Sequence, residues 1–146
     1  MRVETSRFGE IEISEDLILD FVQPVFGYEN YSKYTIIEHD GNDMFQWLQC
    51  TEDAELAFPI SIPSYFGIKD YIFEINDETA EKLETDDAQD LMIYNIVTIP
   101  SGNPKGATIN LLGPIVINTK NNKAVQYVIT NSNYSSKYPL FETEKI

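Results

Sequence analysis

The sequence has too few cysteines and histidines for several common kinds of site. Its 146 residues include one cysteine, Cys50, and one histidine, His39. Structural zinc needs several Cys or His ligands and an internal disulfide needs two cysteines, so both are excluded. A catalytic triad needs a nucleophile beside a base, and His39, at the end of an expected strand, is more typical of a surface residue. We therefore expect no enzyme, no bound metal and no cofactor.

Long apolar runs are also missing. None approaches the roughly 20 residues that span a bilayer, so no membrane association is expected. The first ten residues contain no apolar stretch of the kind found in secretory signals. Together with the single cysteine, these features favour the cytoplasm. The length fits a single domain over residues 1–146, and such a domain buries roughly 70% of the surface of its unfolded chain.

Basic residues are scarce: ten Lys or Arg stand against 24 Asp or Glu. Residues 1–90 contain 22 of the acids and five of the bases, a net charge of −17, whereas residues 91–146 carry +3. Because phosphate binding depends on Lys and Arg, direct nucleic-acid binding is not expected. The acids favour a basic protein partner, whose encounter they would accelerate. An equally good interpretation is that they only keep a small protein soluble.

What is present is a series of short strand patterns. Apolar and polar residues alternate, or apolar residues cluster, in segments bounded by turn residues, which predicts strands. These segments are 9–14, 34–39, 45–50, 55–61, 71–75, 91–100, 107–118 and 124–130. Asn121-Asn122 suits a tight hairpin, and residues 76–84 predict a helix with Asn76 as its N-cap. We predict a mainly β fold, an antiparallel barrel or sandwich with one or two short helices.

Two groups of side chains are candidates for contacts with a partner. Tyr65 and Phe66 lie in a predicted loop bounded by Pro63 and Gly67, where aromatic residues can act as binding anchors or can pack onto the barrel. Glu74, Asp86 and Asp87 flank the predicted helix, and their charges would orient a partner. By contrast, Leu48 and Cys50 fit one buried strand face, and Glu52 and Asp53 fit a solvated rim beside it.

Several motifs resemble the flagellar assembly factor family FliW. "NIVTIPSGNPKGATINLLGPIVIN" is similar to the family's V-T-I-P strand end, variable loop, N-L and A-P-I-V-I-N, with Gly113 where Ala is common. "WLQCTEDAELAF" resembles W-L-Q-S/D-x-D-P-E-L-A-F, with Ala54 in place of Pro. "RFGEIEI" near the start and "YSSKYPL" near the end also match. The resemblance runs from about residue 2 to residue 141.

The resemblance implies a compact β-barrel-like protein without catalytic residues. FliW-like proteins bind CsrA, a small RNA-binding dimer, and relieve its repression of flagellin mRNA translation. They also bind flagellin, which competes with CsrA. The resemblance thus implies CsrA and flagellin as partners, and Tyr65, Phe66, Glu74, Asp86 and Asp87 are our candidate partner-binding residues.

Two other functions are consistent with the residues alone. A barrel of this size can hold a small ligand in its interior, so a small-molecule-binding carrier is the main alternative. With 24 acids, some pair of carboxylates will lie at a distance suited to a hydrolase, although no pair stands out.

Overall fold

The computed structural model describes residues 1–38, 44–130 and 132–141, and within them regular structure is mostly β. The strands are β1 (Arg2–Thr5), β2 (Gly9–Glu12), β3 (Leu19–Gln23), β4 (Lys33–Glu38), β5 (Gln46–Cys50), β6 (Ala57–Ser61), β7 (Leu91–Thr98), β8 (Thr108–Ile109), β9 (Ile115–Asn118), β10 (Lys123–Gln126) and β11 (Tyr138–Pro139). The α-helix is α1 (Asp77–Leu83), and the short 3-10 helices are η1 (Glu15–Leu17), η2 (Pro63–Phe66), η3 (Ala88–Asp90) and η4 (Pro104–Gly106). The predicted mainly β class with a short helix is confirmed.

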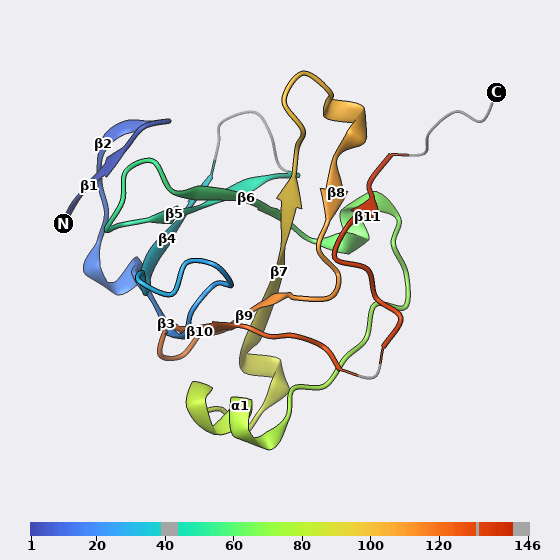
Figure 1. Cartoon of the computed structure of the whole chain (residues 1–146). Coiled ribbons are helices and arrows are strands. Elements are labelled where there is room, and N and C mark those ends of the chain that lie inside the picture. Colours follow the sequence, from blue (N-terminus) through green and yellow to red (C-terminus); the bar gives the residue numbers. More distant parts are fainter. Residues whose placement is uncertain (39–43, 131, 142–146) are drawn as a thin grey trace.

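Seven strands close into a barrel. Their order is β7–β6–β5–β4–β3–β10–β9, and β9 pairs back onto β7 (Figure 1). Six of these pairings are antiparallel, and β3 with β10 is parallel. A ring with an odd number of strands cannot alternate in direction all the way round, so one parallel pair is unavoidable. The predicted barrel is therefore confirmed as a mixed barrel rather than a wholly antiparallel one.

The barrel interior is filled by side chains. Tyr34, Leu48, Cys50, Ile60 and Ile115 are fully buried there and belong to one apolar cluster. Because successive strand residues point to opposite faces, Leu48 and Cys50 both enter this cluster from β5. The predicted shared buried face of these two residues is confirmed.

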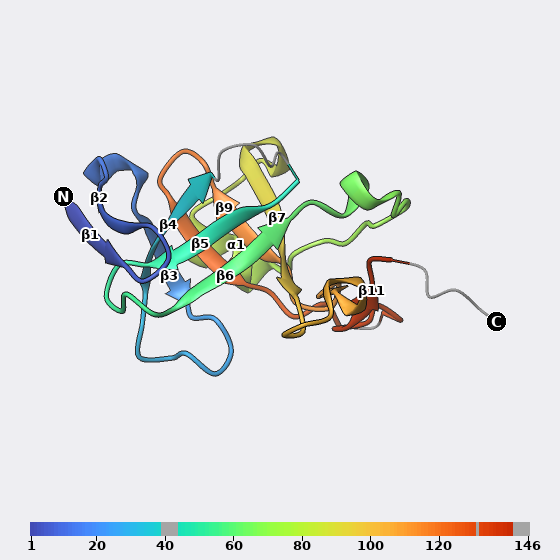
Figure 2. The same ribbon diagram turned by 90° about the horizontal axis from the view of Figure 1, so that it is seen from above.

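The helix α1 covers a second apolar cluster outside the barrel wall. Its N-terminus is capped as predicted, because the Asn76 side chain accepts a hydrogen bond of 2.8 Å from the Thr79 amide. Leu83 is fully buried against Val116 and Val125. A small sheet of β1 and β2 lies at the end of the molecule opposite η2 (Figure 2).

The β9–β10 connection is the predicted asparagine hairpin. Asn122 has φ of 61°, a left-handed conformation that asparagine tolerates better than most residues. The side-chain Nδ2 of Asn121 donates to the Leu83 carbonyl at 3.1 Å, which joins the hairpin to the end of α1. The turn thus also supports the helix.

Candidate protein-binding site

In the acid-rich stretch at residues 47–58, the Gln49 side chain contacts the backbone of the turn that follows it, an arrangement that we call the clasp. Gln49 is fully buried, and its Nε2 lies 3.0–3.3 Å from four backbone carbonyl oxygens of the β5–β6 turn. These carbonyls belong to Cys50, Asp53, Ala54 and Leu56. The Asp53, Ala54 and Leu56 carbonyls also accept from backbone amides, and the Gln49 side chain adds its two N–H donors at the centre of the turn. The glutamine of the W-L-Q motif therefore holds the turn that follows it.

The acids in this stretch also make structural contacts. The Glu52 carboxylate accepts hydrogen bonds of 2.9 Å from the Ser32 and Lys33 amides. The Asp53 carboxylate accepts one of 3.0 Å from the Tyr31 hydroxyl. Glu52 is exposed, as predicted, but Asp53 is partly buried, and both tie this turn to the start of β4. Sequence reasoning missed these contacts because the partners lie about 20 residues away.

Cys50 has the environment of an inert core residue. Its side chain is fully buried, and burial raises the pKa of the thiol. A thiol held protonated in this way is a poor nucleophile.

The barrel wall has a gap beside the first half of β7. The strand β6 pairs with β7 only through Ile60 and Ser61, opposite Ile96 and Asn95. The chain then turns away at Pro63 into η2. Residues 91–94 of β7 continue beyond this point and pair with β9 on their other side. One edge of β7 is thus left without a neighbouring strand in the part of the chain that the structure describes.

Residues 69–75 form the far side of the gap. Exposure alternates along the predicted strand at 71–75 as expected: Tyr71, Phe73 and Ile75 are partly buried, and Ile72 and Glu74 are exposed. However, this segment belongs to no sheet, and no backbone–backbone hydrogen bond joins 69–75 to another described residue. The strand prediction for 71–75 is therefore wrong, although the predicted alternation of buried and exposed side chains is present.

The hydroxyl groups of two tyrosines, rather than a neighbouring strand, fix the position of this segment. The Tyr134 hydroxyl accepts a 2.9 Å hydrogen bond from the Ile72 amide and lies 2.9 Å from the Ile72 carbonyl oxygen. The Tyr71 hydroxyl donates to the Leu111 carbonyl at 2.7 Å and accepts from Asn95 Nδ2 at 3.0 Å. Burial raises the pKa of Tyr71, so its hydroxyl remains a donor across the physiological range. Side chains fix the segment, and its backbone remains largely free.

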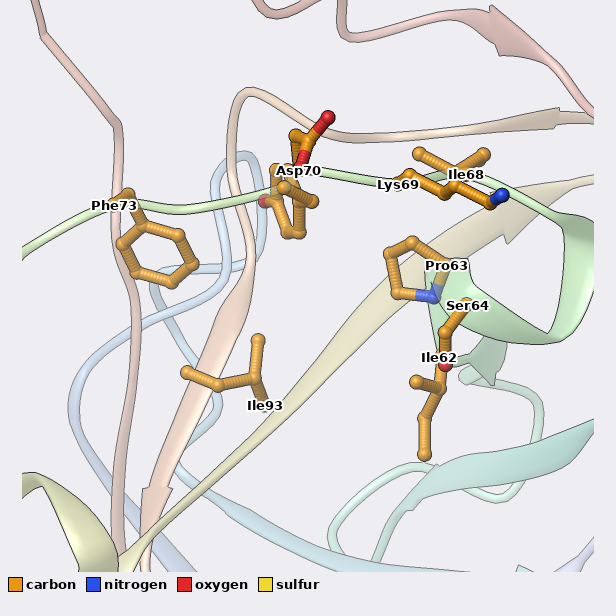
Figure 3. A pocket seen from close by; sticks show the side chains of 9 residues that line it. Ile62, Pro63, Ser64, Ile68, Lys69, Asp70, Phe73 and Ile93 are labelled. Atoms are coloured by element: carbon orange, nitrogen blue, oxygen red, sulfur yellow. The ribbon is translucent and has the colours of Figure 1, made fainter.

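A groove of two adjoining parts lies between this segment and β7. In Figure 3, Ile93 of β7 stands between Phe73 on one side and Ile62 and Pro63 on the other. The first part has a volume of about 480 Å³ and the second of about 370 Å³, and they share Phe73 and Ile93. The first is lined by Ile62, Pro63, Ser64, Ile68, Lys69, Asp70, Tyr71, Phe73 and Ile93. The second is lined by Phe73, Glu74, Ile75, Ala88, Leu91 and Ile93.

One of the five candidate residues lines this groove, and the other four adjoin lining residues in the sequence. Glu74 lines it directly, Tyr65 and Phe66 follow Ser64 at one end, and Asp86 and Asp87 precede Ala88 at the other. The sequence pattern did not identify the apolar lining, because Ile62, Phe73 and Ile93 are separated in the chain and each fits an ordinary strand. The alternation of residues 71–75 was the available signal.

Tyr65 and Phe66 differ in their surroundings. They lie in the 3-10 helix η2 rather than in the predicted loop. Tyr65 is 52% exposed, whereas the Phe66 ring packs against the rings of Phe45 and Phe141 at centroid distances of 5.6 and 6.3 Å. Tyr65 is therefore available to a partner, and Phe66 mainly supports the site.

Negative charge around the groove is largely uncompensated. Glu78, Glu84 and Asp90 form ion pairs with nearby lysines. No ion pair joins Asp70, Glu74, Asp86 or Asp87 to another described residue, and Lys69 is the one base among the lining residues. Exposed charges of this kind contribute little to folding stability but set the field that an approaching partner meets.

The described residues contain no group of three or more His, Cys, Asp or Glu arranged to hold a metal ion. No helix among them is long and apolar enough to cross a membrane. His39 lies outside the described residues.

Comparison with known proteins assigns the chain to a family. The family model described as "FliW protein" matches residues 2–140. The chain belongs to the FliW family. A flagellar assembly factor FliW from Alkaliphilus metalliredigens (strain QYMF) is 41% identical over 143 residues, 97% of this chain and 87% of the relative. One from Treponema denticola is 35% identical over 141 residues, 96% and 93% of the two chains.

A crystal structure described as that of the flagellar assembly factor FliW supports the same assignment. It superposes with a TM-score of 0.90 at 29% identity, covering 99% of this chain and all of the other. The resemblance found in the motifs is confirmed. FliW proteins are non-enzymatic assembly factors, which agrees with the expectation that this chain is not an enzyme.

Proposed function

We propose that this protein acts in flagellar assembly by binding the translational regulator CsrA and antagonising its repression of flagellin mRNA translation. Flagellin is the competing partner, so a rise in free flagellin releases CsrA. The observation that carries the proposal is the match to the FliW family over residues 2–140. The groove and its acids supply a place and a charge suited to a protein partner.

Charge gives this proposal a physical mechanism. An RNA-binding surface must be basic, and an acidic protein bound nearby lowers its affinity for phosphate. Charges act over roughly 8 Å at cellular ionic strength, so the acids need not enter the RNA site. Asp86, Asp87 and Glu74 orient the partner and repel RNA. Tyr65 serves as the apolar anchor, and Phe66 keeps η2 in position.

Calorimetric titration with purified CsrA, with and without flagellin, tests the proposal. We expect saturable binding that weakens as salt is raised, and loss of CsrA binding once flagellin is in excess. Absence of heat with CsrA at several temperatures, together with no retention on immobilised CsrA, would show that this chain does not antagonise it.

The barrel interior gives little support to the small-molecule carrier. Tyr34, Leu48, Ile60 and Ile115 fill it and are fully buried. Native mass spectrometry of freshly purified protein separates the two functions, because a carrier would show a bound small molecule.

A further inference from the structure

The open edge of β7 has backbone groups directed toward the groove. The Asp90 carbonyl accepts from the Thr119 amide at 3.0 Å, and the Ile96 carbonyl accepts from the Asn110 amide at 2.9 Å. Both bonds lie on the β8–β9 side of β7. The backbone N–H and C=O groups of successive strand residues point to alternate sides. Those of Met92 and Tyr94 therefore also point toward β9.

By the same alternation, the Leu91 C=O and the N–H and C=O of Ile93 point to the opposite side, whereas the Leu91 N–H donates to the Ala88 carbonyl at the end of η3. On that side, Ser61 of β6 pairs with Asn95, but β6 ends before it reaches Leu91 and Ile93. Both residues line the groove. The groove therefore combines apolar side chains with backbone donors and acceptors that an extended chain could use.

The opposite wall of the groove, residues 69–75, also has backbone groups without strand partners. Residues 69–75 make no backbone–backbone hydrogen bonds to other described residues, and Asp70 among them has a left-handed φ of 60°. The outward side chains Asp70 and Glu74 bring negative charge to the same place.

We propose that the groove binds an extended segment of a partner protein, which adds as a strand to the open edge of β7. Residues 91–94 rise about 3.3 Å each, so the segment has about four or five residues in register. Its alternate side chains are apolar and enter the groove against Ile93 and Phe73. Those between them are Lys or Arg and face Asp70 and Glu74, in the manner of strand addition at exposed sheet edges.

This inference rests on the proposed function, since it names the site and the form of the segment through which a partner binds. Residue-resolved amide hydrogen exchange, measured by NMR, tests it with CsrA and with flagellin as the added proteins. We expect the Ile93 amide to exchange at least about tenfold more slowly in the complex. The Met92 and Tyr94 amides are internal controls, because their hydrogen bonds to β9 exist in both states.

The possible outcomes separate the two proposals. If CsrA or flagellin binds and the Ile93 amide is unchanged, strand addition is wrong and the proposed function stands. The NMR signals of the Ile93 and Phe73 side chains could instead shift while exchange of the Ile93 amide stays unchanged. In that case a helix or another non-strand segment occupies the groove, and strand addition is again wrong.

If neither protein binds, a peptide decides the matter. The probe is an acetylated, amidated seven-residue peptide alternating lysine and valine, compared with its backbone N-methylated form. Protection of the Ile93 amide by the first peptide alone would support the inference although the proposed function had failed. No protection at millimolar peptide would overturn it.

A charge-reversal pair tests the polar half of the inference. Glu74→Lys should weaken binding of the basic peptide, or of whichever protein partner binds, about fivefold at low salt. Glu15→Lys makes the same charge change at an exposed position in η1 and should have a smaller effect. Equal effects of the two variants would mean that net charge alone acts, and that basic side chains do not contact the groove.

Discussion

Replacing Gln49 by glutamate is the sharpest test of the clasp beneath β5. The change is almost isosteric, but it exchanges the Nε2 donor for an oxygen. That oxygen would face the same four carbonyl oxygens at 3.0–3.3 Å in a fully buried site. The glutamate must therefore be protonated in the folded protein, where one O–H replaces two N–H donors.

The expected loss of stability depends on pH. Full burial raises a carboxyl pKa by up to about 3–5 units, which would take the pKa of a glutamate here from about 4.3 to about 7 or more. A folded-state pKa above the unfolded one means that stability is greatest below about pH 4.3 and falls as pH rises toward the folded pKa. Each pH unit in this window removes about 1.4 kcal/mol, so about 2–3 kcal/mol should disappear between pH 5.5 and pH 7.5.

Urea unfolding followed by the fluorescence of Trp47, the single tryptophan, measures this directly. Gln89→Glu is the matched control, because it adds the same charge at an exposed position. We expect the free energy of unfolding of Gln49→Glu to fall with pH relative to both the parent and Gln89→Glu. Equal pH dependence in the two variants would refute the clasp.

Four further results are expected. Phe66→Ala should lower the free energy of unfolding by about 2 kcal/mol or more, because its ring packs between two others. Tyr65→Ala should leave stability unchanged and raise the CsrA off-rate in surface plasmon resonance; a normal off-rate would place the anchor elsewhere. Cys50→Ser should cost about 1–3 kcal/mol through a buried hydroxyl without a partner, with CsrA binding retained; a normal thermal midpoint with lost binding would contradict this. Asp86→Asn with Asp87→Asn should slow CsrA association and leave RNA partly bound, and unchanged rates would exclude these acids from steering.

Much of the fold could be predicted because its signals are local. Alternation along β5 placed Leu48 and Cys50 on one buried face. The N-cap of α1 and the asparagine hairpin depend on residues within a few positions of one another. Propensity and turn chemistry act over such distances, so a single sequence contains the information.

The contacts that shape the candidate site are not local. Residues 71–75 have the pattern of a strand, but whether a neighbour pairs with them depends on where β6 ends. The Tyr134 hydroxyl that holds Ile72 is 62 residues away. The sequence around Phe66 is typical of an exposed loop. Only the structure shows that its ring packs against the ring of Phe45. Sequence reasoning therefore named one residue that lines the groove, Glu74, without finding the groove.

The open edge of β7 raises a physical problem that its surroundings partly solve. An exposed strand edge with apolar neighbours invites pairing between copies of a chain, and natural proteins usually cover such edges or place charge beside them. Here the edge is recessed behind residues 69–75, and Asp70 and Glu74 lie at its border. Two copies approaching edge to edge would bring these acids together and repel each other. A basic segment would be attracted by the same acids. The charges that disfavour self-association therefore also favour a basic partner.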